Sequence, residues 1–237
     1  MKRKMVAFIS AAALLTALLA GCGGTGGQSE PPSTPPAPVS GEPAQGEELP
    51  TLEHNTDAAD APTVYMTTDI SPEGLMAIYE ALNWTPTGSV AVKLSTGEPP
   101  NSNYLRPELI KDVVQAVDGT IVECNTAYGG QRSSTAMHYQ VAEDHGFTAI
   151  ADVVILDENG SMTIPVSGGT HLSENYVGEH FADYDSYLVL SHFKGHAMAG
   201  FGGAIKNISI GLGSQEGKCV IHTGGASHDS PWGGDQT

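Results

Sequence analysis

Two histidines and two lysines lie close together in a glycine-rich stretch, residues 191–206, with the sequence SHFKGHAMAGFGGAIK. The chain has a formal net charge of -17, yet no acidic residue lies between Asp185 and Glu216. This local excess of cations favours a site for an anion or an anionic cofactor. Glycines let backbone N–H groups approach such a ligand, and a helix beginning near Gly203 would add its N-terminal partial charge. The alternative is a tight strand-to-helix turn with solvated lysines.

The side chains of this stretch suit proton transfer or nucleophilic attack. His196 and Lys206 beside one anion could exchange protons with it, and desolvation or a neighbouring cation would lower the pKa of Lys206 and make it a nucleophile. Gly195 between His192 and His196 argues against a helix there, so a helical metal-binding histidine pair is not indicated. The expected cofactor-binding residues of the stretch are Lys194, Gly200, Gly202 and Gly203.

Two further histidines are candidates for metal ligands. His171 follows Gly168-Gly169-Thr170, a turn that could aim its ring inward. His222 ends a predicted strand and is either a ligand or a half-buried strand residue. We expect His138 and His145, on a predicted helix, to be surface or capping residues.

Strands and helices alternate along the chain. Strands are predicted at residues 63–68, 89–94, 120–124, 152–156, 185–190 and 218–222, with an edge segment at 162–165. Helices are predicted to begin near Ser71, Pro107 and Ser134, where serine caps or a first-turn proline precede apolar residues at helical spacing. This order predicts an α/β domain at residues 63–237, with three layers and a mainly parallel sheet.

Polar residues follow three of the predicted strands. Lys93 and Ser95 come after one strand, residues 125–132 after the next, and residues 192–206 after a third. Ligands of open α/β sheets bind beyond the carboxyl ends of the strands. We therefore expect Lys93 and Asn125 to join the glycine-rich stretch in one cofactor site.

The N-terminus has the order of a bacterial lipoprotein signal. Lys2, Arg3 and Lys4 precede an apolar run, and Leu19-Ala20-Gly21-Cys22 resembles a lipobox. We expect residues 1–21 to be a signal peptide and Cys22 to carry lipid that anchors the protein to the extracytoplasmic side of the cell membrane. Residues 22–62, rich in Pro, Gly, Ser and Glu, are predicted to form a disordered tether.

Charge and cysteine content limit the partners and cofactors. A sequence pI of about 4.6 argues against nucleic acid as a partner. With Cys22 assigned to lipid, Cys124 and Cys219 are either free buried thiols or one disulfide. The chain has no C-x-x-C motif for an iron–sulfur cluster, so the cofactor is unknown, and a metal ion and an anionic cofactor both stay open.

From Val90 to about Gly225 the sequence resembles the bacterial and archaeal family called domain of unknown function 362. The segments that carry the resemblance are VAVKLSTGEP, RPELIKDVV, ECNTAYGGQR, GGTHL and SHFKGHAMAGFGGAIKNISIG. Many members are associated with iron–sulfur ferredoxin segments that follow this domain, so the resemblance implies a redox partner. The chain stops at Thr237, where related proteins continue, and we expect a C-terminally truncated sequence.

Residues 196–206, HAMAGFGGAIK, also resemble a motif in the N-terminal domain of nickel-dependent lactate racemase. This resemblance implies that His196 is an acid/base, that Lys206 is the attachment point of a nickel pincer cofactor and that His222 is a metal ligand. Three hypotheses follow. They are a lipoprotein that binds a metal or an anionic cofactor and is linked to redox chemistry, a solute-binding lipoprotein without catalysis, and a racemase-like enzyme.

Overall fold

The computed structural model describes residues 61–196 and 199–232 of the 237-residue chain. The predictions for the signal peptide, for the lipidated Cys22 and for the tether up to residue 60 lie outside the described residues. Within the described part, no helix is long and apolar enough to cross a membrane.

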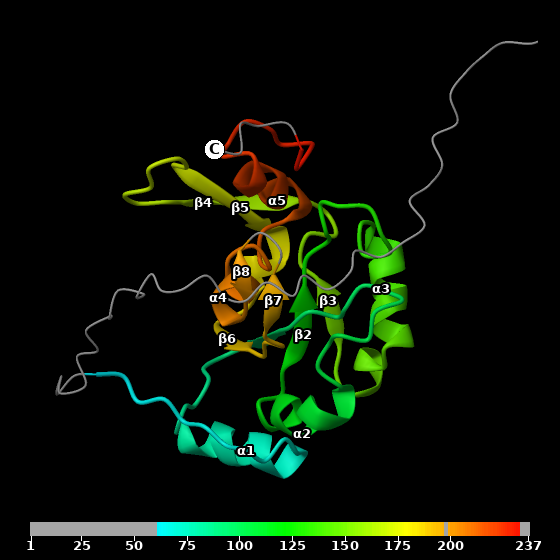
Figure 1. Ribbon diagram of the computed structural model, residues 1–237, viewed down its shortest axis with the longest axis vertical. Helices are drawn as coiled ribbons and strands as arrows, with labels where there is room; N and C mark the ends of the chain where they lie inside the picture. The colour runs from blue at the N-terminus through cyan, green and yellow to red at the C-terminus, as the bar shows by residue number, and fades with distance from the viewer. Residues whose placement is uncertain (1–60, 197–198, 233–237) are drawn as a thin grey trace, which may run out of the picture. The chain divides into compact units, whose positions relative to one another are not determined.

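A four-stranded parallel sheet forms the centre of the domain, in the order β3-β2-β1-β6 (Figure 1). Its strands are β1 (Val90–Lys93), β2 (Thr120–Glu123), β3 (Val153–Ile155) and β6 (Ser186–Val189). In register, Val92 lies opposite Ile121 on one side and Leu188 on the other. All four strands fall within predicted ranges, and the predicted α/β class is confirmed.

Helices precede, connect and follow these strands along the chain. They are α1 (Pro72–Ala81), α2 (Pro107–Ala116), α3 (Thr135–Asp144), α4 (Ala204–Ile208) and α5 (Gln215–His222), with short 3₁₀ turns η1 (Phe147–Ala149) and η2 (Glu179–Asp183). As predicted, Ser71 caps α1, its hydroxyl accepting from the Gly74 N–H at 3.0 Å, and Pro107 opens α2. The predicted helix beginning near Gly203 is α4.

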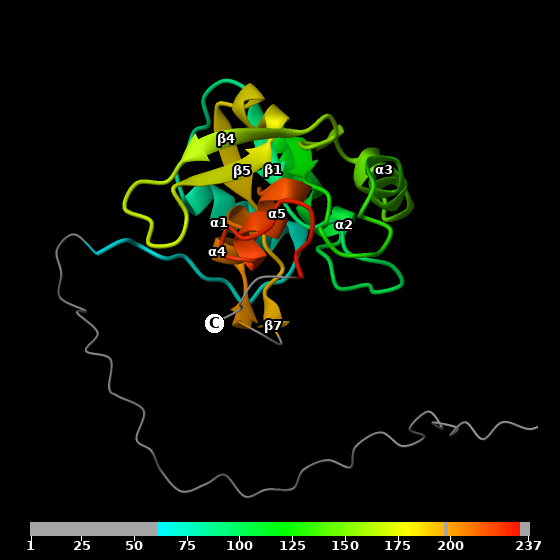
Figure 2. The same ribbon diagram turned by 90° about the horizontal axis from the view of Figure 1, so that it is seen from above.

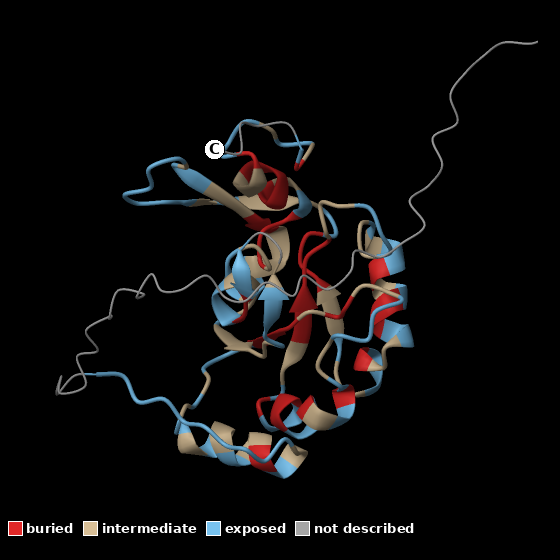
Figure 3. Ribbon diagram, in the orientation of Figure 1, coloured by how far each residue is buried: buried red, intermediate tan, exposed pale blue. Residues whose placement is uncertain are grey.

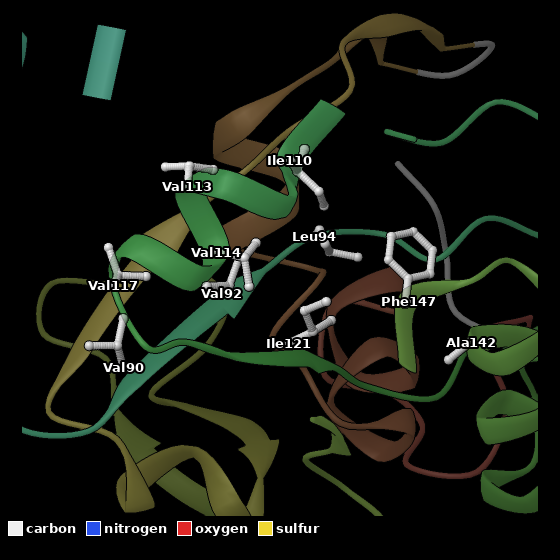
Figure 4. Packing of buried hydrophobic residues seen from close by; sticks show 10 residues of the cluster. All are labelled: Val90, Val92, Leu94, Ile110, Val113, Val114, Val117, Ile121, Ala142 and Phe147. Atoms are coloured by element: carbon white, nitrogen blue, oxygen red, sulfur yellow. The ribbon is translucent and has the colours of Figure 1, made fainter. Parts of the chain in front are cut away.

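The two faces of the sheet bury different sets of side chains. Val90 and Val92 point to the face covered by α2, where the cluster in Figure 4 packs: Val90, Val92, Leu94, Ile110, Val113, Val114, Val117, Ile121, Ala142 and Phe147. Because strand side chains alternate, Ala91 points to the opposite face and packs with Val122, Cys124, Leu156 and Leu212. The sheet is therefore the middle of three layers, and its two central strands, β1 and β2, are largely buried (Figure 3).

Two small antiparallel sheets complete the domain. One pairs β4 (Ser161–Pro165) with β5 (Glu174–Gly178), and β4 contains the predicted edge segment. The other pairs β7 (Lys194–His196) with β8 (Gly200–Gly202), so these two strands lie within the glycine-rich stretch of residues 191–206. Both views place the β7–β8 hairpin beside α4 (Figures 1 and 2).

Two strand predictions were wrong. Residues 63–68 form no strand, and their apolar side chains are exposed, with Val64 85% and Met66 86% accessible. Residues 218–222 belong to helix α5, because Ser214 caps the helix by accepting from the Gly217 N–H at 3.0 Å.

Cys124 and Cys219 are both buried free thiols. Of the two arrangements that the sequence left open, the structure has the one without a disulfide.

Candidate functional site

A cavity of about 270 Å³ lies at the carboxyl ends of β1 and β2, among the β7–β8 hairpin, α4 and α5. Its lining is strongly cationic and includes Lys93, Arg132, Lys194, Lys206 and Lys218, together with His192 and His196. Among the described residues that line it, Glu123 is the one carboxylate. An acidic protein thus concentrates positive charge around one hollow.

Lys93 is the last residue of β1 and is only 1% exposed. Its ammonium donates to the Leu94 carbonyl at 2.5 Å and to Asn207 Oδ1 at 2.9 Å. The Asn207 amide is oriented by its own donation to Ser191 Oγ at 2.9 Å, so its oxygen faces the lysine. The pKa of Lys93 is lowered to about 8, chiefly by burial, with Lys218 and Arg132 contributing to the shift and Glu123 opposing it.

Lys218 is a second buried lysine, 5% exposed, and it reaches the cavity from α5. Its ammonium donates to the Gly213 carbonyl at 2.5 Å. Since an ammonium has three N–H groups, Lys218 keeps two of them for a ligand and Lys93 keeps one. Across residues 61–196 and 199–232, no lysine is paired with a carboxylate.

The β7–β8 hairpin has one polar and one aromatic face. Its register pairs Lys194 with Gly202, and Lys194, His196 and Gly202 all line the cavity. Residues alternate along a strand, so Phe193 and Phe201 lie on the outer face, 73% and 64% exposed, with ring centroids 6.3 Å apart.

Lys206 extends from α4 across the hairpin. A Cβ placed on Gly202 would lie 3.6 Å from Lys206 Cδ, so the lysine stem runs along the glycine backbone. The half-buried Lys206 has a lowered pKa, first because of desolvation and then because Lys194 and Lys218 repel its charge.

Arg132 is fixed at the cavity wall by two carboxylates. Its Nη1 donates to Glu123 Oε1 and its Nε donates to Glu98 Oε2, both at 3.0 Å. Glu123 Oε2 accepts from Thr96 Oγ1 at 2.6 Å and lies 3.0 Å from His138 Nε2. Burial acts to raise the pKa of Glu123, but Arg132 and His138 hold it well below its usual range. The charge of Glu123 is therefore already engaged.

His138 is completely buried in this network, so the prediction that it is a surface or capping residue was wrong. Its Nδ1 lies 3.2 Å from Asn125 Oδ1 and its Nε2 faces Glu123. His145, in contrast, does occupy the C-cap of α3.

The structure brings most of the predicted site residues together. The predicted residues that line the cavity are Lys93, Lys194, His196, Gly202, Gly203 and Lys206. Gly200 and Asn125 do not line it. Gly200 begins β8 with a φ of 70°, and the Asn125 N–H donates to Asp157 Oδ1 at 2.8 Å.

The two predicted metal ligands lie apart from this lining. His171 is exposed in the segment between β4 and β5. His222 lies on α5, where Nδ1 donates to the Lys218 carbonyl at 2.6 Å and Nε2 accepts from the hydroxyl of Tyr128, which itself lines the cavity. In the part of the chain that the structure describes, no cluster of three His, Cys, Asp or Glu residues has a metal-binding arrangement.

The sequence analysis did not place Lys218 at the site, and it included Tyr128 and Arg132 only as part of the polar segment 125–132. Lys218 was assigned to a strand, and only the helix that Ser214 caps turns its side chain toward the cavity. Arg132 had a usable signal, because it ends the polar segment that follows β2.

A family model described as Domain of unknown function (DUF362) matches residues 90–231. The chain belongs to this family. No curated protein and no solved structure matched the chain. The DUF362 match contains every residue that lines the cavity, from Lys93 to Lys218, and its description assigns no activity.

Proposed function

We propose that this DUF362 domain binds a small oxyanion, a phosphate or a carboxylate, in the cationic cavity. The observation that carries the proposal is the pair of buried lysines, Lys93 and Lys218. Both face the cavity, and neither is paired with a carboxylate among the described residues.

The energetics favour an anion as the missing partner. A buried ammonium without a counter-charge costs several kcal/mol, so uncompensated buried cations are seldom kept without a function. Glu123 is the one carboxylate among the described lining residues, but Arg132, Thr96 and His138 already bind it. An anion in the cavity would receive the remaining N–H groups of Lys93 and Lys218 as charge-assisted hydrogen bonds.

The proposal also includes a cellular location for the domain. A lipid on Cys22 would hold it at the extracytoplasmic side of the cell membrane through the tether of residues 22–62. The support is the order of basic, apolar and lipobox residues at the N-terminus. The protein would then be an anion-binding lipoprotein.

A second candidate function is catalysis at Lys206. His196 and Lys206 line the same cavity, and the lowered pKa of Lys206 makes it a better nucleophile. The resemblance to lactate racemase points to the same lysine as an attachment site. An added mass on Lys206 in the intact protein would favour this function over simple binding.

A resident metal has less support from the described residues. His222 uses both ring nitrogens in hydrogen bonds, and His171 lies outside the cavity lining. Among the described residues, these two histidines do not form a metal-ligand set with the groups around them, so the proposed function contains no metal or redox centre.

Titration calorimetry with inorganic phosphate tests the proposed function. The full chain in a non-ionic detergent should bind phosphate. Lys93→Met and Lys218→Met should each weaken binding about tenfold or more, because each removes a charge-assisted hydrogen bond. Lys111→Met, at an exposed position on α2, is the matched control and should bind like the unaltered chain. Absence of binding by phosphate, sulfate and oxalate would contradict the proposal, as would equal affinity in all three variants.

A further inference from the structure

We infer that the cavity contains two anion subsites and that its natural ligand is a small molecule with two anionic groups, of the diphosphate class. This inference rests on the proposed anion-binding function and specifies its ligand.

The cations of the cavity fall into two sets, according to the elements that carry them and to how deeply they are buried. Lys93 at the end of β1 and Arg132 in the β2–α3 segment form an inner set. Lys194 on β7 and Lys206 on α4 form an outer set. Lys218 reaches the cavity from α5, and its charge acts on both Lys93 and Lys206. Lys218, on a further element, lines the cavity together with both sets.

The two sets also differ in how firmly they are held. The inner cations are anchored, Lys93 by Leu94 and Asn207, and Arg132 by Glu98 and Glu123. In the outer set, the ammonium groups of Lys194 and Lys206 donate no hydrogen bond within the described residues. An inner anion would thus bind a prebuilt subsite, whereas an outer anion would draw two unanchored lysines onto itself.

Size and charge both exceed what one oxyanion needs. A cavity of about 270 Å³ offers more space than one tetrahedral oxyanion fills. It is still slightly smaller than a typical pocket for a drug-sized ligand. The four lysines and Arg132 face one carboxylate, already engaged, so a single phosphate leaves the outer lysines without a partner. A compact molecule with two anionic groups satisfies both sets.

The test compares inorganic phosphate with diphosphate by titration calorimetry on the full chain at constant ionic strength. Diphosphate should bind about tenfold more tightly than phosphate or better. The double variant Lys194→Met/Lys206→Met should lose most of that advantage and keep its phosphate affinity within about threefold. Lys93→Met should weaken the binding of both ligands, and Lys111→Met should weaken the binding of neither.

The outcomes separate this inference from the proposed function. Equal affinity for phosphate and diphosphate would overturn the two-subsite arrangement and leave anion binding intact. If the double variant Lys194→Met/Lys206→Met weakens the binding of phosphate and of diphosphate equally, the two-subsite arrangement is also overturned and anion binding is left intact. If neither ligand binds while circular dichroism shows a folded protein, the proposed function fails and the inference fails with it.

Discussion

At the residue scale, the buried charge of Lys93 in the cavity lowers the stability of the fold. Lys93 ends a strand whose residues are all buried, and its pKa of about 8 compares with an ordinary value of 10.5. Because one pKa unit corresponds to about 1.4 kcal/mol, the charged form of Lys93 costs the fold about 3 kcal/mol. A methionine of similar length would avoid this cost, which is why the lysine calls for a functional explanation.

The lowered pKa gives a pH dependence with a definite sign. Between pH 8 and 10.5 the unfolded chain holds a proton on Lys93 that the folded chain has released, so this residue makes stability rise with pH across that window. We predict that Lys93→Met is more stable than the unaltered chain at pH 7, by about 1–3 kcal/mol, and that its advantage shrinks above pH 8. Urea unfolding from pH 7 to 9.5 measures this difference. A constant difference across the range would show that Lys93 does not titrate there.

Glu123 has the opposite effect, since its pKa is depressed and its charge stabilises the fold. We predict that Glu123→Gln lowers the free energy of unfolding by about 2–4 kcal/mol at pH 7, because Arg132 loses its buried partner. This decrease in the free energy of unfolding should have its full size above the ordinary pKa of 4.5 and should become smaller as the pH falls below it. Chemical denaturation at pH 7 and pH 4 measures both values.

Glu80→Gln, at an exposed position at the end of α1, is the control and should stay within about 0.5 kcal/mol of the unaltered chain. A similar small effect for Glu123→Gln would mean that the buried network contributes little to folding.

Local patterns predicted some of these residues and not others. The composition of the glycine-rich stretch indicated Lys194, His196 and Lys206 as site residues. Lys93 was indicated by its position at the carboxyl end of a predicted strand. The role of His138 depends on Glu123, a residue on a different element, and no local pattern in the sequence connects the two.

At the element scale, the packing of the segment that contains α4 and α5 determines how the chain closes over Lys93. A Cβ on Gly211 would lie 1.9 Å from the Asn207 carbonyl oxygen and 3.1 Å from Lys93 Cε. The chain between the two helices therefore closes over the lysine only because position 211 lacks a side chain.

We predict that Gly211→Ala destabilises the domain by about 1–3 kcal/mol and weakens phosphate binding, since the backbone must move away from Asn207 and Lys93. Gly129→Ala is the matched control, because a Cβ there meets nothing within 4 Å. Thermal unfolding followed by calorimetry with phosphate measures both effects. Equal behaviour of the two variants would refute the packing argument.

Helix α5 shows why one element was mispredicted. Residues 218–222, KCVIH, are apolar and β-branched enough to suit a strand. The helix is set by its start, where Ser214 caps it and Asp157 Oδ2 accepts from the Gln215 N–H at 2.8 Å. Asp157 lies in the turn after β3, so the deciding contact is tertiary. The three-residue strands β7 and β8 were likewise too short to show a period.

For the whole molecule, the contrast between overall and local charge is the central feature. The chain carries -17, yet the cavity gathers four lysines and an arginine. Acidic surroundings repel anions, so the cavity is where an anion finds a favourable potential. The parallel sheet that creates this site was predictable, because strand and helix periodicities are short-range signals. The meeting of Lys93 with the segment that contains Arg132 was predicted from the ends of the strands, whereas the approach of Lys218 was not, since it depends on helix α5.

Anomalous scattering from selenate, a tetrahedral dianion, tests anion binding most directly. Crystals of the full chain would be soaked in selenate and measured at the selenium edge. We predict an anomalous peak inside the cavity, at hydrogen-bond distance of about 2.7–3.2 Å from Nζ of Lys93 or Lys218. A map with a well-ordered, accessible cavity and no peak in it would contradict the account.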